Sequence, residues 1–145
     1  MSSTTTIGQA VPSPEPGTFM AMLTAAQHDD LVARSSVLVR AAGETVFREG
    51  EESTSVLVLL SGRVRARSAG DGGISVTLGP GSLLGELSAV CGKPRTATVR
   101  AVDAARLLVV PVAEYLSLLE TDGGIATAQL RRFIGRYRQT ERMRG

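Results

Sequence analysis

A short stretch of the chain, residues 85–96, carries the residue types that hold a phosphorylated sugar. Gly85 allows the backbone to approach a ligand closely, and the residues from Glu86 to about Val90 favour one short helical turn whose free N–H groups can face an anion. Arg95 supplies a planar guanidinium that can contact two phosphate oxygens at once, and Thr96 adds a hydroxyl donor beside it.

Glu86 predicts the other half of the ligand. A carboxylate repels phosphate, but it accepts hydrogen bonds from hydroxyl groups. A site that combines Glu86 with Arg95 therefore suits a molecule with sugar hydroxyls at one end and phosphate at the other. A cyclic nucleotide fits this description.

The run from residue 85 to residue 99, GELSAVCGKPRTATV, resembles the phosphate-binding cassette of cyclic-nucleotide-binding domains. These are the β-roll modules of protein kinase regulatory subunits, cyclic-nucleotide-gated channels and bacterial catabolite activator regulators. Residues 42–51 resemble the hairpin region of that family, and residues 56–64 resemble its following strand, glycine and strand. The resemblance extends over roughly Phe19 to Leu119, which is most of the chain.

The resemblance implies a fold that is mainly β with flanking helices. It is an eight-stranded β-roll, a double-stranded β-helix of the jelly-roll kind, with an N-terminal helix, a short cassette helix and two C-terminal helices. The ligand-binding residues that it implies in the cassette are Gly85, Glu86, Leu87, Ser88, Arg95, Thr96 and Ala97.

The last helix of the catabolite activator family forms the dimer interface, and a Thr near its end reaches the purine ring. Counting without gaps from Arg95 places Thr140 at that position, followed by Glu141 where the family has a Ser. Thr140, with Glu141 beside it, is therefore the candidate contact to the base. An unpaired surface Thr is the alternative.

The resemblance does not fix the base of the ligand. Thr96 is similar to the hydroxyl that favours guanine in some eukaryotic members, whereas bacterial members with Ser or Thr there commonly bind the adenine nucleotide. We expect cAMP rather than cGMP.

The elements that would position these residues follow from the periodicity of the chain. Thr24 can cap a helix from Ala25 to about Arg34, and from Val37 onward short β-rich runs alternate with glycines. Ile74, Val76 and Leu78 form one buried face of a strand that pairs with residues 63–68 through the turn 71–73. The wholly apolar run 107–110 predicts a central strand that ends at Pro111.

Two helices should close the chain. After Pro111 one helix face carries Val112, Tyr115, Leu116 and Leu119, and Gly123-Gly124 then breaks the helix and offers a hinge. The second helix runs from about Ile125 to Met143. Its narrow apolar seam is typical of a core or dimer contact and consists of Ala126, Leu130, Phe133, Ile134 and Tyr137.

Composition favours one small domain. The chain has 145 residues, of which 43% are hydrophobic and 21% charged, and no apolar run has the length of a membrane span. Residues 1–17 are rich in Ser, Thr and Pro and predict a disordered tail. The predicted division is a tail at 1–17, a roll at 18–122 and a C-terminal lid and dimerisation helix at 123–145.

Metal and disulfide chemistry have little support. Cys91 is the only cysteine, so an internal disulfide, an iron–sulfur cluster and a cysteine-rich zinc site are excluded, and a cytoplasmic location is expected. Cys91 reads as a small residue that fills the cassette, or else as a redox-sensitive thiol over the ligand. His28 is the only histidine and is expected on an exposed helix face rather than on a metal.

The net charge of +2 is too small to indicate nucleic-acid binding. Six arginines lie between Arg131 and Arg144 with only Glu141 against them. That cluster suits a solvated helix face, with nucleic acid, an anionic membrane or an acidic partner as alternatives.

Three functions remain open, and none is enzymatic, because the chain lacks a Ser–His–Asp set, paired metal ligands and a Walker loop. The first is a cyclic nucleotide receptor that signals through its C-terminal helix to a dimer mate or a protein effector. The second is the sensory domain of a longer regulator: a transcription factor, channel or enzyme. The third is a β-roll interaction module that has lost its ligand. No direct DNA binding is expected, since no helix-turn-helix follows the roll.

Overall fold

The computed structural model describes residues 12–69 and 75–144, with side chains as far as residue 135. The elements in chain order are a 3₁₀ turn (Met20–Met22), α2 (Ala25–Ala33), β1 (Ser36–Arg40), β2 (Thr45–Phe47), β3 (Ser55–Ser61), β4 (Val64–Arg67), β5 (Ser75–Leu78), β6 (Leu83–Leu84), α3 (Glu86–Cys91), β7 (Thr98–Ala101), β8 (Ala105–Pro111), α4 (Val112–Thr121) and α5 (Gly123–Arg144).

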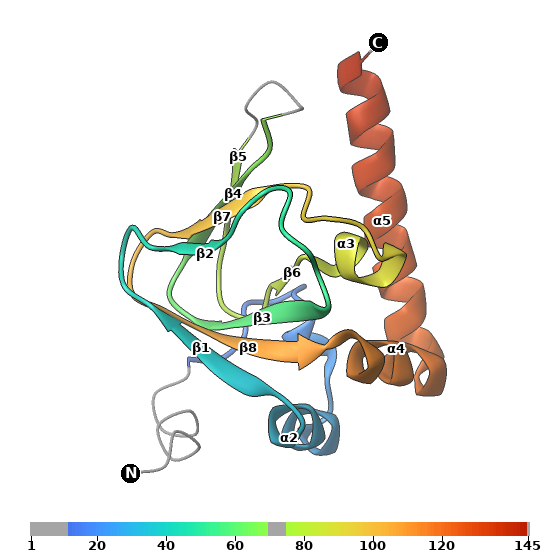
Figure 1. The fold of residues 1–145 in the computed structure, drawn as a ribbon. Helices are drawn as coiled ribbons and strands as arrows, with labels where there is room; N and C mark the ends of the chain where they lie inside the picture. The colour runs from blue at the N-terminus through green and yellow to red at the C-terminus, as the bar shows by residue number, and fades with distance from the viewer. Residues whose placement is uncertain (1–11, 70–74, 145) are drawn as a thin grey trace.

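The eight strands form two four-stranded antiparallel sheets. The first sheet has the order β1-β8-β3-β6 and the second has the order β2-β7-β4-β5. Figure 1 shows α3, α4 and α5 grouped beside the roll, while α2 lies below the first sheet. The prediction of a mainly β roll with an N-terminal helix, a cassette helix and two C-terminal helices is confirmed.

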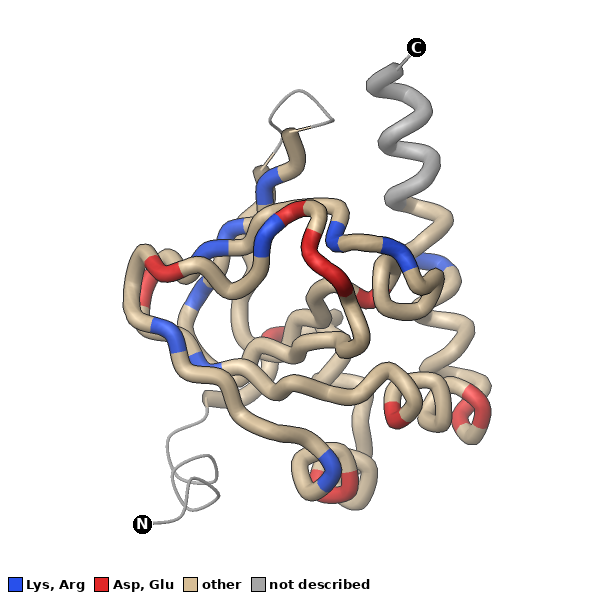
Figure 2. The backbone as a smooth tube through the Cα atoms, viewed as in Figure 1, with Lys and Arg blue, Asp and Glu red and all other residues tan. Residues whose placement is uncertain are grey.

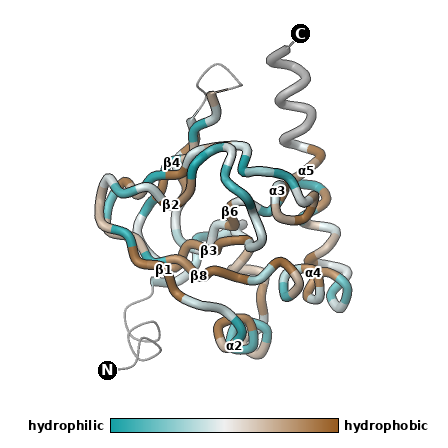
Figure 3. Tube along the Cα trace, in the orientation of Figure 1, coloured by the Kyte–Doolittle hydropathy of each residue, from teal (hydrophilic) through white to brown (hydrophobic). Residues whose placement is uncertain are grey.

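Three strands of the first sheet, β3, β6 and β8, contribute to two cores, because alternate residues of each strand point to opposite sides of the sheet. In β3, Val56, Val58 and Leu60 join the core between the sheet and the helices, whereas Leu57 and Leu59 join the core inside the roll. The strands β6 and β8 divide in the same way. The continuous hydrophobic colour of β3 and β8 in Figure 3 follows from these two cores. The predicted central strand is β8, which lies between β1 and β3.

The second sheet buries only one face. In β7, Val99 and Ala101 are buried, whereas Arg100 between them is exposed. The predicted pairing of β4 with β5 is confirmed, with Val64 opposite Leu78, while Ile74 and the predicted turn at 71–73 lie outside the described residues. Val76, predicted to be buried, is 52% exposed. The reason is that β5 is an edge strand, so Val76 has a neighbouring strand on one side only.

Residues 12–17, which the sequence assigns to a disordered tail, contact the roll. Glu15 donates its backbone N–H to the carbonyl of Pro80 at 2.9 Å, and its carboxylate pairs with Arg63 at 2.8 Å. Residues 1–11 lie outside the described residues. The predicted domain limits at residues 17 and 122 stay predictions.

The helix α2 begins as predicted at a Thr24 cap. Thr24 Oγ1 accepts from the backbone N–H of Gln27 at 3.1 Å, and Gln27 Oε1 accepts from the backbone N–H of Thr24 at 2.9 Å. The Gln27 amide also donates to Asp122 Oδ2 at 3.0 Å. The start of α2 is thereby tied to the junction of α4 and α5.

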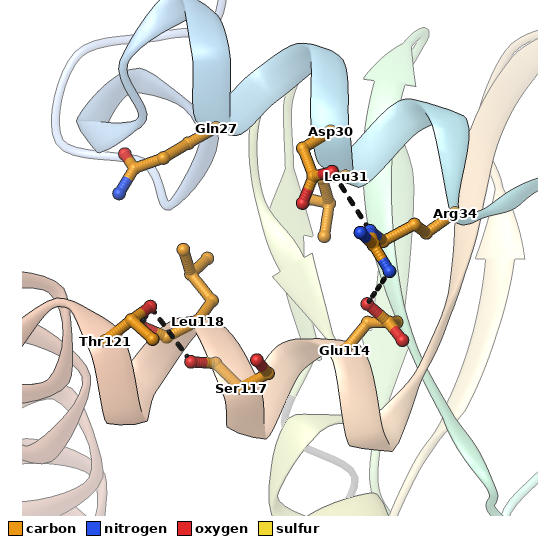
Figure 4. Close-up of a pocket in the computed structure, with 8 residues that line it drawn as sticks. All are labelled: Gln27, Asp30, Leu31, Arg34, Glu114, Ser117, Leu118 and Thr121. Carbon is orange, nitrogen blue, oxygen red and sulfur yellow. Dashed lines mark hydrogen bonds and ion pairs between the residues drawn. The ribbon is translucent and has the colours of Figure 1, made fainter.

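A hollow of about 240 Å³ separates α2 from α4. Figure 4 shows Arg34 of α2 between Asp30 and Glu114, with which it forms ion pairs at 3.0 and 3.7 Å. This hollow is lined by residues of α2 and α4 and by none of the cassette residues.

The break between the last two helices lies at Asp122 rather than at Gly123-Gly124. Asp122 has an extended conformation, with φ −133° and ψ 98°, and the two glycines form the first turn of α5. Asp122 Oδ1 accepts from the backbone N–H groups of Gly124 and Ile125 at 3.0 and 3.1 Å, which makes Asp122 the N-cap of α5. The helix therefore starts two residues before the predicted Ile125 because a side chain satisfies its first N–H groups.

The apolar faces of the last helices differ in part from the prediction. Tyr115 is buried and contacts Phe19 edge to face, with ring centroids 5.8 Å apart, but Leu116 is exposed. In α5, Ile125 is buried, whereas Leu130 and Ile134 are 57% and 43% exposed. The side chain of Tyr137 lies outside the described residues.

Asp122→Ala should lower the melting temperature at neutral pH, since α5 loses its cap and α2 loses its bond to the junction. The hydrogen bonds from Gln27, and then from the backbone of Ile125 and Gly124, lower the pKa of Asp122. A carboxylate whose pKa is lower in the folded state stabilises the fold at pH values above its unfolded-state pKa. This stabilisation is lost as the pH falls through the folded-state pKa. The stability difference between the parent and Asp122→Ala should therefore shrink as pH falls below about 4.

The measurement is thermal unfolding by circular dichroism from neutral pH to acid. Glu120→Ala, which removes an exposed carboxylate from the last turn of α4, is the control and should change little at any pH. A pH-independent difference between Asp122→Ala and the parent would contradict the role of the ionised carboxylate.

Candidate functional site

The centre of the site is the Arg95 guanidinium, which is buried inside the roll. Arg95 lies between α3 and β7 and is 6% exposed. Its Cζ atom is 4.2 Å from the centroid of the Phe47 ring, in cation–π contact. Its Nη1 donates to the carbonyl of Gly85 at 3.0 Å, and Ser88 Oγ is 3.5 Å away.

This buried cation has no carboxylate at ion-pair distance among the described residues. Burial lowers the pKa of Arg95, and the charges of Glu51 and Glu86, farther off, oppose that shift. A desolvated charge without a close counter-charge is costly. An anion that enters this site therefore gains an attraction which the protein does not itself satisfy.

The conformation of Gly85 makes room for the guanidinium. Gly85 is the N-cap of α3 and has φ +71°, a left-handed conformation that side chains rarely adopt. A Cβ atom on Gly85 would overlap Arg95 Nη1. The glycine is thus needed twice, for its backbone conformation and for the space that Arg95 fills.

Glu86 begins α3 and connects the cassette to the last helix. It is 1% exposed, and its Oε1 lies 4.0 Å from Arg132 Nη2 of α5. Arg132 Nη1 in turn donates to Oε1 of the buried Gln129 at 3.0 Å. A buried carboxylate at the start of α3 suits the hydroxyl-accepting role predicted from the sequence.

The other predicted cassette residues fall into two groups. Ser88 is buried, and its Oγ contacts the Gly85 carbonyl at 3.2 Å and Ser53 Oγ at 3.3 Å. Ala97 is half-buried, while Leu87 and Thr96 are exposed. The structure thus brings Gly85, Glu86, Ser88 and Arg95 together, and leaves Leu87 and Thr96 at the surface. Thr140 and Glu141 belong to α5, but their side chains lie outside the described residues.

Sequence reasoning missed three neighbours of the site: Phe47, Gln129 and Arg132. Arg132 was counted in the arginine cluster and assigned to a solvated helix face, yet it is half-buried against Glu86. The position of Gln129, three residues before Arg132 and so on the same face of α5, is the one local signal that could have marked this contact.

The other candidate groups do not add chemistry to the site. Cys91 is exposed, so it is not a filler of the cassette. His28 contacts Asp29 at 3.1 Å on the surface of α2. Within the part of the chain that the structure describes, no group of three or more metal-binding side chains is found. Over the same residues, no helix combines the length and hydropathy needed to cross a bilayer.

Comparisons with known proteins find relatives of this chain in both sequence and fold. Residues 37–122 match the family described as the cyclic nucleotide-binding domain. The crystal structure of the catabolite activator protein of Thermus thermophilus has a TM-score of 0.71 and 25% identity, covering 85% of this chain and 59% of that chain. The N-terminal domain of a transcriptional regulator from Streptomyces coelicolor A3(2) has a TM-score of 0.61 and 32% identity, covering 84% of this chain and 89% of that chain.

Among curated proteins, lysophospholipase nte1 of Neurospora crassa is 32% identical over 103 residues, which is 64% of this chain and 7% of that protein. The chain spans between 5% and 21% of the length of curated relatives such as a putative potassium channel protein of Rhodopseudomonas palustris and the lysophospholipases NTE1. The similarity to these long proteins therefore concerns one region of each.

Gly85→Ala should lower stability more than Gly92→Ala. Both glycines have left-handed φ angles, +71° and +65°, so both variants bear a backbone cost of about 1–2 kcal/mol. Only at Gly85 does the added Cβ collide with Arg95, whereas nothing lies within 4 Å at Gly92. Denaturant unfolding measures the two free energies. Equal losses would show that the guanidinium does not need the space at Gly85.

Proposed function

The chain belongs to the cyclic nucleotide-binding domain family, and we propose that its cassette binds cAMP in preference to cGMP and transmits that binding through α5. The observation that carries the proposal is the pair of buried opposite charges in one cassette. Arg95 offers a guanidinium without a close carboxylate among the described residues, and Glu86 offers a buried carboxylate. The cyclic phosphate would bind Arg95, and the ribose 2′-hydroxyl would donate to Glu86.

Arg95 is already oriented for this role. Its bond to the Gly85 carbonyl and its contact with the Phe47 ring hold the guanidinium in place before the ligand arrives. Pre-organisation of this kind reduces the entropy that binding would otherwise lose. The first N–H groups of α3 have no intrahelical partner and add donors for the phosphate oxygens.

Transmission through α5 is supported by the contact between Glu86 and Arg132. A ribose hydroxyl that donates to Glu86 competes with Arg132 for the same carboxylate, so ligand binding alters how firmly α5 is held. A ligand shifts a conformational equilibrium only when it binds the two states unequally. The competition at Glu86 supplies such a difference.

The choice of base rests on the far end of α5. Thr140, with Glu141 beside it, is the proposed contact to the purine, by resemblance to the catabolite activator regulators. Thr96, at the surface of the cassette, adds a hydroxyl near the phosphate. We propose cAMP on this basis.

A homodimer through α5 is part of the same proposal. Leu130 and Ile134 are one helical turn apart and are 57% and 43% exposed, so they form an apolar strip on the surface of the helix. A second copy that packs against this strip would remove it from water. A protein effector is the alternative occupant.

The proposed role is regulatory rather than catalytic, and the proposed location is the cytoplasm. The chain spans a small part of its curated relatives, so a sensory domain of a longer regulator is an alternative setting for the same binding activity. A β-roll that has lost its ligand is less well supported, because such a module would not need the buried charges of Glu86 and Arg95.

Arg95→Gln should weaken cyclic nucleotide binding at least tenfold, because charge-assisted bonds worth about 1.5–3 kcal/mol each are lost. Isothermal titration calorimetry with cAMP and cGMP side by side measures both the loss and the preference for the base. Arg48→Gln, which neutralises an exposed arginine after β2, is the control and should bind like the parent. Unchanged affinity in Arg95→Gln, or no binding of either nucleotide by the parent, would refute the proposed ligand.

Replacement of both Leu130 and Ile134 by Glu should dissociate the dimer. The apolar strip would then carry two charges that cannot be buried against a second copy. Sedimentation velocity of the ligand-bound protein measures the change. Leu116→Glu, at an exposed apolar position of α4, is the control. A monomeric parent, or a double variant that remains dimeric, would exclude α5 as the dimer interface.

A further inference from the structure

The outer face of the second sheet carries three arginines that the nucleotide site does not use. Arg65 and Arg67 are exposed on β4, and Arg100 is exposed on β7. The register places Arg65 directly opposite Arg100, and Arg67 opposite Thr98. We call these three residues the arginine face. Their strands turn Val64, Val99 and Ala101 inward, so the arginine face lies on the side of the sheet away from Arg95.

Among the described residues, the arginine face carries an excess of positive charge. Like charges directly opposite on neighbouring strands repel each other. Among the described residues, no carboxylate lies at ion-pair distance from Arg65, Arg67 or Arg100. Glu49 lines the same hollow and brings one negative charge to it, outside ion-pair distance of the three arginines, and its Oε1 accepts from the backbone N–H of Ala69 at 3.1 Å. Figure 2 shows the resulting concentration of basic positions along these strands.

The arginine face also borders a hollow. A space of about 460 Å³ is lined by Glu49, Arg65, Arg67, Ala69, Thr98 and Arg100. The loop after β2 closes one side of it, where Glu49 donates its backbone N–H to Thr98 Oγ1 at 3.0 Å. The three arginines therefore border a space that side chains of another molecule can enter.

An ion pair beside the arginine face shows one kind of group that binds an arginine there. Arg63 stands directly before β4, two residues ahead of Arg65. Its Nη2 pairs with Glu15 Oε2 at 2.8 Å, from the non-helical segment 12–17 that runs along the roll. A carboxylate on an irregular segment thus already neutralises this neighbouring arginine. Residues 1–11 contain no Asp or Glu, so they offer no carboxylate to Arg65 and Arg67, and Asp71 lies outside the described residues.

We propose that the arginine face docks an acidic segment of a partner protein, whose carboxylates bind Arg65, Arg67 and Arg100. Guanidinium groups match carboxylates in bidentate geometry, and arginine is enriched at the energetic centres of protein interfaces. An anionic membrane is a poorer match, because lipid recognition uses clusters of about 4–8 basic residues. Nucleic acid is also a poorer match, because none of the described residues that line the hollow is an aromatic residue on which a base could stack.

The test uses the full chain and a fluorescein-labelled hexaglutamate peptide, with hexaglutamine as the uncharged probe. Fluorescence anisotropy at low salt measures binding to the parent, to Arg65→Gln/Arg100→Gln, and to Arg48→Gln/Arg131→Gln. The two double variants have the same net charge, so they separate a local site from general attraction. We expect the first pair to weaken hexaglutamate binding at least about fivefold and the second pair to change it less than about twofold.

Thermal unfolding at low salt provides a second readout. Because Arg65 and Arg100 repel each other across the strands, their double variant should melt at or above the temperature of the parent. A lower melting temperature would show that the arginines stabilise the sheet, and it would overturn the proposal.

Three binding results would also overturn it. One is hexaglutamate bound no better than hexaglutamine. Another is an equal loss in both double variants, which would indicate attraction by net charge alone. The third is a single-stranded oligonucleotide, or phosphatidylserine vesicles, whose binding is lost in Arg65→Gln/Arg100→Gln while hexaglutamate binding is kept.

Discussion

The structure depends on holding one positive charge inside a β-roll without a carboxylate at ion-pair distance among the described residues. The Arg95 guanidinium is kept there by the face of Phe47 and the carbonyl of Gly85. Both partners attract a cation without neutralising it. A direct ion pair would lower the cost of burying this charge. It would also make any anion that enters the site compete with a protein carboxylate for Arg95. The cassette instead keeps Glu86 at the start of α3 and in contact with Arg132.

The buried guanidinium of Arg95 needs rigid surroundings. The strands β3 and β8, which contribute to both hydrophobic cores, provide them. Because β3 and β8 are buried on both faces, the same strands pack against the helices on one side and close the roll on the other. Leu84 belongs to the roll core and stands next to Gly85, so the cassette begins directly at the end of a buried strand. The core therefore positions Gly85. The backbone of Arg95 is held by the loop after β2, since its N–H donates to the carbonyl of Glu51 and its carbonyl accepts from the N–H of Gly50, both at 2.8 Å.

The local parts of this arrangement were predictable from sequence. Gly85, Glu86 and Arg95 lie within eleven residues of each other, and the predicted pairing of residues 63–68 with the strand that ends at Leu78 is found as β4 with β5. The parts set by tertiary structure were not predictable. Val76 has the pattern of a buried residue but lies on an edge strand, and Arg132 has the pattern of a solvated residue but contacts Glu86. Gly123 and Gly124 predicted a break, whereas the cap at Asp122 includes both in α5.

Two contacts of α5 with the rest of the molecule, at Asp122 and at Arg132, differ in their distance from the cassette. At its start, Asp122 caps the helix and bonds to Gln27 of α2, far along the chain from the cassette. Ten residues after Asp122, Arg132 connects the helix to Glu86, which is itself a proposed ligand contact, and also donates to Gln129 Oε1. A ligand in the cassette can weaken only the contact at Arg132 directly. The first two residues of α5 are glycines, which are poor helix formers. The backbone next to the Asp122 cap is therefore the part of the helix that changes direction at the lowest cost. The sequence of α5 thus suits rotation about Asp122 rather than release of the whole helix.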